Sequence, residues 1–124
     1  MELAKNLEER SIKAAKKFLA RRGAKVIDFD LDGYKNIDTV CVDEGKLVFV
    51  VVTYTVNEPD TRKKKFKECK ASRNVLEEDM INCLVDILDE YPELDELPLR
   101  FDEIALCIFS ESQAALRRHT NILA

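Results

Sequence analysis

The chain has 124 residues, of which 46% are apolar and 35% are charged, and its net charge is −4. A chain of this size buries about two-thirds of its unfolded surface, which predicts a single domain spanning residues 1–124. Because no apolar run approaches the roughly 20 residues of a membrane helix, and because the first residues are charged, we expect a soluble cytoplasmic protein with no membrane partner.

The first predicted element is an amphipathic helix over residues 3–22. Its apolar and small residues gather on one broad arc, namely Leu3, Leu7, Ala14, Ala15, Phe18 and Leu19. Arg10, Lys13, Lys17 and Arg21 form a basic stripe beside this arc. Gly23 suits the left-handed conformation that ends a helix, and residues 24–29 then read as a strand.

Two β-rich apolar runs follow, over residues 37–42 and 47–52. They flank the short polar connection Asp43, Glu44, Gly45 and Lys46, whose glycine accepts positive φ. This pattern predicts an antiparallel hairpin. Residues 49–52 are continuously apolar, which is typical of a strand buried on both faces.

The second half of the chain begins with a break at residues 57–60. Asp60 or Thr61 can cap a helix over residues 62–72, and a second helix is predicted over residues 75–90. Residues 91–98 read as a loop and residues 103–109 as a buried strand. Glu111 and Ser112 signal a turn, and propensity alone favours a helix over residues 113–119.

Several segments together resemble a known family. Residues 36–40 (NIDTV) and 48–53 (VFVVVT) are similar to the GEIDLI and VFVEVK strands of the YraN-like family of bacterial proteins, within the PD-(D/E)xK nuclease superfamily. Residues 100–105 (RFDEIA) resemble the family's RFDVVA strand. The resemblance implies an α/β (α+β) fold with a restriction-endonuclease-like mixed sheet flanked by helices. The implied order is αβββαα-ββ, with residues 113–119 as a closing strand that carries His119.

The resemblance also implies where an active site would lie. Asp38 matches the family's metal-binding aspartate, but Val51 stands where its glutamate would be and Thr53 where its lysine would be. A metal-dependent nuclease needs two or three converging carboxylates and a cation. We therefore expect a degenerate site with a vestigial Asp38 and no cofactor. Ile12, too, departs from the family, which usually places a helix glutamate there.

A relocated site is the alternative. Mg²⁺ or Mn²⁺ would then bind at Asp38 with carboxylates supplied from elsewhere, namely from Glu8, Glu9, Asp28 or Asp30. The DxDxDG pattern of Asp28, Asp30, Asp32 and Gly33 resembles half of a calcium loop, but its twelfth position is Thr39, so solvated turn acids are the simpler interpretation. The four cysteines lack CxxC spacing, which favours free thiols over zinc ligands.

Charge is unevenly distributed along the chain. Seven of the 20 basic residues lie within residues 62–73, whereas residues 77–102 are rich in acids and hold one arginine. The candidate nucleic-acid contacts are Arg62, Lys63, Lys64, Lys65, Lys67 and Lys70. Cations at a helix N-terminus are mildly unfavourable, so local stability does not explain them. Two interpretations stay open, a solvated helix face and phosphate contacts with DNA or RNA.

Three functions follow as hypotheses. The first is a nuclease-fold protein without hydrolytic chemistry that binds nucleic acid or acts as an accessory module. The second is an active Mg²⁺- or Mn²⁺-dependent nuclease with relocated ligands. The third is a homodimeric protein-interaction domain that pairs through an exposed strand edge or helix face.

Overall fold

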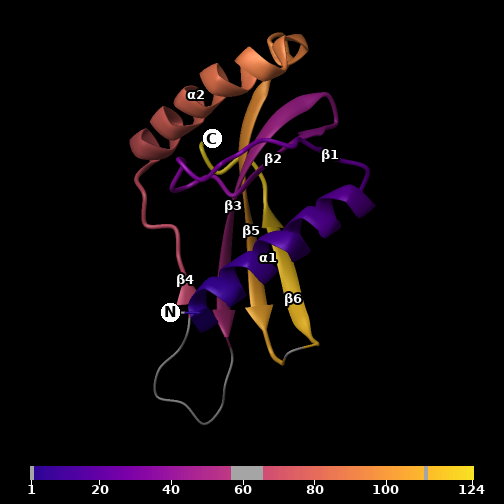
Figure 1. Cartoon of the computed structure of the whole chain (residues 1–124), viewed down its shortest axis with the longest axis vertical. Helices are drawn as coiled ribbons and strands as arrows, with labels where there is room; N and C mark the ends of the chain where they lie inside the picture. Colours follow the sequence, from indigo (N-terminus) through magenta and orange to yellow (C-terminus); the bar gives the residue numbers. More distant parts are fainter. Residues whose placement is uncertain (1, 57–65, 111) are drawn as a thin grey trace.

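The computed structural model describes residues 2–56, 66–110 and 112–124. Its elements are α1 (Glu2–Arg21), β1 (Lys25–Val26), β2 (Thr39–Asp43), β3 (Lys46–Val56), β4 (Phe66–Lys67), α2 (Arg73–Glu90), a 3₁₀ turn η1 (Pro92–Leu94), β5 (Leu99–Ile108) and β6 (Ala114–His119). Two helices and a mixed sheet confirm the predicted α+β class (Figure 1).

The sheet has six strands in the order β1-β2-β3-β5-β6, with β4 paired to β3. α2 connects β3 to β5, and these two strands run parallel, whereas the other pairs are antiparallel. At Tyr54 and Thr55, β5 already occupies one edge of β3, so β4 lies on the other edge. β2 and β4 therefore share one edge of β3, at successive positions along it.

The hairpin between β2 and β3 is confirmed. Asp43 pairs with Lys46, and the two residues between them, Glu44 and Gly45, both have positive φ, at 51° and 74°. Positive φ at both central residues is the geometry of a two-residue turn that matches the twist of the flanking strands. β3 continues to Val56, four residues beyond the predicted apolar run.

The predicted helix over residues 62–72 is wrong for its described part. Phe66 and Lys67 pair with β3 as β4, and Ser72 is extended, with φ −68° and ψ 162°. The Ser72 side chain accepts a hydrogen bond from the Val75 N–H and so begins α2. Residues 62–65, and the predicted caps Asp60 and Thr61, lie outside the described residues. The described part of the predicted helix is therefore a short strand followed by a loop, and the next helix begins at the cap Ser72.

The two helices pack against opposite faces of the sheet. Even-numbered residues of β3, such as Val48, Val50 and Val52, pack with Ala15 and Leu19 of α1. Odd-numbered residues of β3 pack instead with the buried residues of α2, which are Leu76, Met80, Cys83 and Ile87. This alternation follows from the two-residue period of a strand, and it confirms that β3 is buried on both faces.

The last strand is also confirmed. Residues 114–119 pair with β5 from Ile108 back to Glu103, although their helical propensity is high. A six-residue ladder of backbone hydrogen bonds outweighs propensity differences of a few tenths of a kcal/mol per residue. In the part of the chain that the structure describes, none of the helices combines the length and the apolar character needed to cross a membrane.

Candidate functional site

The candidate site lies at a gap in the sheet edge. Thr39 of β2 pairs with Val50, and β4 begins to pair at Tyr54, so among the described residues no strand pairs with residues 51–53 on this edge. Asp38 fills the gap with two hydrogen bonds. Its N–H donates to the Val50 carbonyl at 2.8 Å, and its Oδ2 accepts from the Val52 N–H at 2.7 Å. The carboxylate therefore satisfies a backbone donor that the sheet leaves open.

Lys67 of β4 contacts two carboxylates, those of Asp38 and Glu8. Its Nζ lies 3.1 Å from Asp38 Oδ1, 3.0 Å from Asp38 Oδ2 and 3.0 Å from Glu8 Oε1 of α1. The side chains are 9% exposed for Asp38, 22% for Lys67 and 46% for Glu8. We call this arrangement the Glu8–Lys67–Asp38 cluster. It joins α1, β4 and the start of β2 through one ammonium group.

The cluster shifts the titration of Lys67. Burial acts to lower the pKa of Lys67, but the charge of Asp38 and the hydrogen bonds to Asp38 and Glu8 outweigh it, so the pKa is raised above its usual 10.5. Lys67 is therefore an ammonium ion at neutral pH, held between two carboxylates.

The two other family positions hold no charge. Val51 is buried in the core under α2. The Thr53 hydroxyl donates to Glu103 Oε2 at 3.0 Å. Glu103 lies on β5 in register with Val51, so a carboxylate stands on the strand beside the position where the resemblance implies one. Apart from its place after the RFD motif, no sequence pattern points to Glu103.

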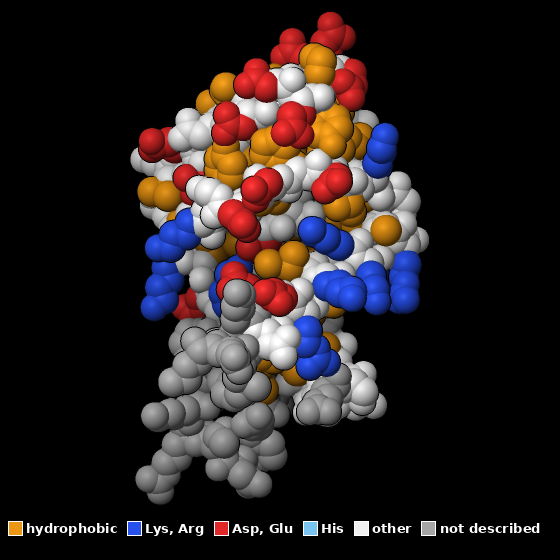
Figure 2. Space-filling model, viewed as in Figure 1, with side chains coloured by type: hydrophobic (Ala, Val, Ile, Leu, Met, Phe, Trp, Pro, Cys, Tyr) orange, Lys and Arg blue, Asp and Glu red, His pale blue; other side chains and the backbone are white. Residues whose placement is uncertain are grey.

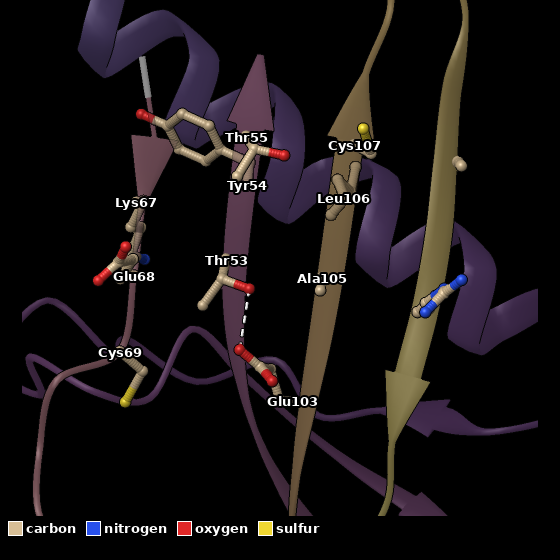
Figure 3. Close-up of a pocket in the computed structure, with 12 residues that line it drawn as sticks. Thr53, Tyr54, Thr55, Lys67, Glu68, Cys69, Glu103, Ala105, Leu106 and Cys107 are labelled. Atoms are coloured by element: carbon tan, nitrogen blue, oxygen red, sulfur yellow. Dashed lines mark hydrogen bonds between the residues drawn. The ribbon is translucent and has the colours of Figure 1, made fainter. Parts of the chain in front are cut away.

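A cleft of about 370 Å³ opens beside these residues on the face of the sheet. Thr53, Thr55, Glu103 and Cys107 come from its two central strands, and Lys67 from β4 also lines it. Figure 3 shows the Thr53–Glu103 hydrogen bond on the floor of this cleft, with Lys67 at one side. Lys67 thus connects the cleft with Asp38.

The donor set does not fit a divalent cation. Among the described residues, no three His, Cys, Asp or Glu side chains are grouped so that they could hold a metal ion. Both oxygens of Asp38 are already hydrogen-bonded, to Lys67 and to the Val52 N–H. A hard cation such as Mg²⁺ needs several free oxygens at about 2.0–2.1 Å, and these residues do not supply them.

Of the four candidates for relocated ligands, Glu8 shares a contact with Asp38, because both carboxylates bind the Lys67 ammonium. Glu9 is exposed on α1. The Asp28 carbonyl accepts a hydrogen bond from the Tyr91 hydroxyl, and the Asp30 carboxylate accepts one from the Asp32 N–H. The latter is the local turn that solvated acids form.

The basic residues divide into separate groups. Arg62, Lys63, Lys64 and Lys65 lie outside the described residues, Lys70 is exposed, and Lys67 contacts Asp38 and Glu8. From Arg10 to Lys25 the chain holds seven basic residues and no acid, and the lysines of this segment are exposed. Because Glu8 of α1 contacts Lys67 of β4, the basic stripe of α1 begins beside the strand that follows residues 62–65.

A second ionic cluster went unpredicted. Asp102 of β5 is fully buried and accepts bonds from Arg100 at 2.9 Å, from Arg118 at 3.1 Å and from the Asn121 N–H at 2.8 Å. Arg118 also contacts Asp43 at 2.9 Å. The hydrogen bond to Asp102 is the main reason why the pKa of Arg100 is raised. We call this the Asp102–arginine cluster.

Comparison of the chain with models of protein families gives no match, and a search of curated proteins gives none either.

Proposed function

We propose that this chain is a divergent nuclease-fold protein that no longer hydrolyses nucleic acid and instead binds it, or acts as an accessory module. The observation that carries the proposal is the position of Lys67 Nζ, 3.0 Å from Asp38 and 3.0 Å from Glu8. An ammonium ion stands between two carboxylates, where a nuclease of this type would hold a metal ion. The Lys67 ammonium, which has a structural role, thus takes the place of a catalytic metal ion.

The topology supports this family. The observed order of a helix, three strands, a helix that crosses over to a parallel strand and a final antiparallel strand follows the αβββαα-ββ order that the resemblance implies, except that β4 and a loop stand where the described part of the first of its two central helices would be. Asp38 immediately precedes β2, and Val51 and Thr53 lie on β3, an arrangement that agrees with the two motifs of the resemblance. The restriction-endonuclease-like fold is therefore our assignment, with β4 as its departure.

The chemistry supports loss of catalysis. A nuclease uses its metal ion to position the phosphate and to lower the pKa of the attacking water. Loss of one such electrostatic or proton-transfer group typically costs about 10²- to 10⁴-fold in rate, and here Val51 and Thr53 replace two of them. The Lys67 ammonium cannot coordinate water as a Lewis acid, so activity falls to background.

Charge supports nucleic-acid contact through α1. Its outer face presents Lys13, Lys16 and Lys17 in the stretch without acids, whereas α2 carries six acids and one arginine. Figure 2 shows acidic side chains concentrated at the top of the molecule, over α2, and Lys and Arg side chains lower down. A phosphate backbone would therefore approach α1 and avoid α2.

The test is binding of a fluorescent 20-nucleotide DNA or RNA, measured by anisotropy over a range of salt. Lys13→Gln, Lys16→Gln and Lys17→Gln together should weaken binding by at least about tenfold and reduce the salt slope by about two to three. The matched control carries Asn74→Glu, Asn82→Glu and Gln113→Glu, which lower the net charge equally but lie away from α1. Equal losses in both variants, or no binding at low salt, would overturn the proposal.

The same assay covers the basic run outside the described residues. Lys63→Glu, Lys64→Glu and Lys65→Glu should also weaken binding if this run contacts phosphates. An unchanged affinity in that variant would restrict the binding surface to α1.

One observation favours the second candidate, an active nuclease with relocated ligands. Glu103 faces the cleft beside the family's glutamate position and bonds Thr53, which stands at the lysine position. This candidate predicts Mn²⁺-dependent cleavage that is abolished by a chelator, by Asp38→Ala and by Glu103→Gln. Cleavage that persists in Asp38→Ala would be assigned to contamination.

A further inference from the structure

α2 carries a second apolar stripe beside its buried face. The stripe consists of Ile81, Leu84, Val85 and Leu88, at positions i, i+3, i+4 and i+7. This spacing places all four side chains on one flank of the helix, in the pattern with which helices pack against each other. We call it the α2 stripe.

The α2 stripe is open to solvent at its centre. Ile81 is 49% exposed and Val85 is 58% exposed, whereas Leu84 and Leu88 are half-buried. Single exposed apolar residues are ordinary. Ile81 and Val85, however, lie one turn apart on the same flank, and Leu84 and Leu88 beside them pack against the core. Hydrophobic side chains lie between the acidic ones at the top of Figure 2, over α2.

The other flank of α2 is occupied by the protein's own chain. The Asn36 Nδ2 donates to Asp79 Oδ2 at 2.7 Å, and the Tyr34 hydroxyl donates to the Asn82 carbonyl at 3.5 Å. The loop between β1 and β2 thus packs along the side of α2 that carries Asp79 and Asn82. The fold covers that flank and leaves Ile81 and Val85 of the α2 stripe exposed.

Acidic residues surround the α2 stripe and define its partner. Residues 77–96 contain nine acids and no base. Glu77 lies one turn before Ile81 and Asp89 one turn after Val85, and both acids are exposed, although Glu77 also pairs with Arg73 of the same helix at 3.7 Å. A second copy of the same surface would bring acids against acids, which is unfavourable, whereas lysine and arginine side chains would be attracted.

We propose that the α2 stripe docks a basic amphipathic helix of a partner protein. The partner's apolar residues would cover Ile81 and Val85, and lysines or arginines on either side of them would pair with Glu77, Glu78 and Asp89. This is helix-to-helix recognition with charge complementarity at its rim. It is independent of the nucleic-acid surface on α1, which lies across the sheet.

The test uses a labelled synthetic helix with a leucine stripe flanked by lysines, and the same helix with glutamates in place of the lysines. Anisotropy should show binding of the lysine helix, which weakens several-fold between about 50 and 300 mM salt as charges are screened, and no binding of the glutamate helix. Ile81→Ser with Val85→Ser should weaken binding by at least about tenfold. Val75→Ser is the matched control, because Val75 is exposed on α2 but off the stripe, and it should leave affinity within about twofold.

Three outcomes would overturn the proposal. They are no binding of the lysine helix at low salt, equal losses in the stripe and control variants, and self-association of the wild-type protein that the stripe variant abolishes. The last result, measured by sedimentation, would make a second copy the occupant. Thermal melting serves as the folding control, since both variants change exposed side chains and should melt within a few degrees of the wild type.

Discussion

The two ionic clusters differ in the balance and the access of their charges. In the Asp102–arginine cluster, Arg100 and Arg118 face Asp102 and Asp43, and Asp102 is fully buried. In the Glu8–Lys67–Asp38 cluster, one ammonium faces two carboxylates at an open sheet edge. The first cluster is neutral and closed, whereas the second keeps an excess negative charge that solvent can reach.

This difference sets a closed, charge-balanced cluster apart from one that is unbalanced and open to solvent. Asp102 joins β5, β6 and the C-terminal turn, because its oxygens accept from Arg100, Arg118 and the Asn121 N–H. Planar guanidinium groups suit such buried, multiply bonded carboxylates. Two acids around one lysine form a less balanced arrangement.

The largest expected effect comes from breaking the closed cluster. Asp102→Ala removes the fully buried carboxylate that Arg100 and Arg118 share, and both arginines are largely shielded, at 12% and 14% exposed. Loss of one partner from a buried ionic group costs about 3–5 kcal/mol. Urea unfolding measures this directly as a drop in the free energy of unfolding. Asp95→Ala in the exposed loop after η1 is the control and should change stability by less than about 0.5 kcal/mol. If Asp102→Ala lowered the free energy of unfolding by less than about 1 kcal/mol, the Asp102–arginine cluster would not be the structural site that we describe.

Removing Asp38 should have an intermediate effect. Asp38→Ala leaves the Val52 N–H without its 2.7 Å acceptor in the gap between β2 and β4, and an unsatisfied buried donor costs about 1–3 kcal/mol. Hydrogen exchange locates the effect of Asp38→Ala. The Val52 amide should lose protection, while the amides paired between β3 and β5 should keep theirs. Unchanged protection at Val52 would show that Asp38 does not hold the edge.

Removing Lys67 should cost less. Lys67→Met keeps the aliphatic stem and removes only the ammonium, which is partly exposed, so we expect a loss of about 1 kcal/mol or less. Added salt should narrow the difference from the wild type, because it screens the repulsion that then remains between Glu8 and Asp38. A loss comparable to that of Asp102→Ala would remove the contrast between the clusters.

The smallest effect is the response to alkaline pH. The folded-state pKa of Lys67 is raised above its usual 10.5, so the stability it contributes is fully present below about pH 10.5 and is lost as the pH rises through the folded value. The difference in unfolding free energy between wild type and Lys67→Met should therefore shrink above about pH 10.5. Arginine stays charged throughout, so the Asp102–arginine cluster should show no such step. If the difference in unfolding free energy between wild type and Lys67→Met stayed constant as the pH rose, the Lys67 ammonium would not stabilise the fold through its ion pairs.

Local sequence patterns predicted those parts of the fold that local physics decides. Helix amphipathicity located α1 and α2, and alternating or continuous apolar runs with Gly45 between them located the β2–β3 hairpin. β6 required the family resemblance, because its helical propensity opposes its strand pairing. Local patterns predict a helix for the segment before α2, because nothing local shows that Phe66 and Lys67 pair with β3.

The sequence locates the candidate site through the resemblance, in which Val51 and Thr53 stand where a glutamate and a lysine would be. The resemblance to two motifs points to Asp38, Val51 and Thr53, and Glu8 is one of the four acids that a relocated site would use. The contact of Lys67 with Asp38 spans 29 residues of chain and depends on the β4 pairing. Arg118 and Asp43 are separated by 75 residues. Such long-range charge pairs depend on the register of the sheet, which a single sequence does not specify.

The proposal that Lys67 stands in place of a metal ion is tested most directly by titration with Mn²⁺, followed by electron paramagnetic resonance of the free ion. Wild type and Asp38→Asn are compared at neutral pH. We expect the same weak, non-saturating uptake in both proteins, because the Asp38 oxygens are already engaged by Lys67 and the Val52 N–H. Stoichiometric Mn²⁺ binding by the wild type that disappears in Asp38→Asn would contradict it.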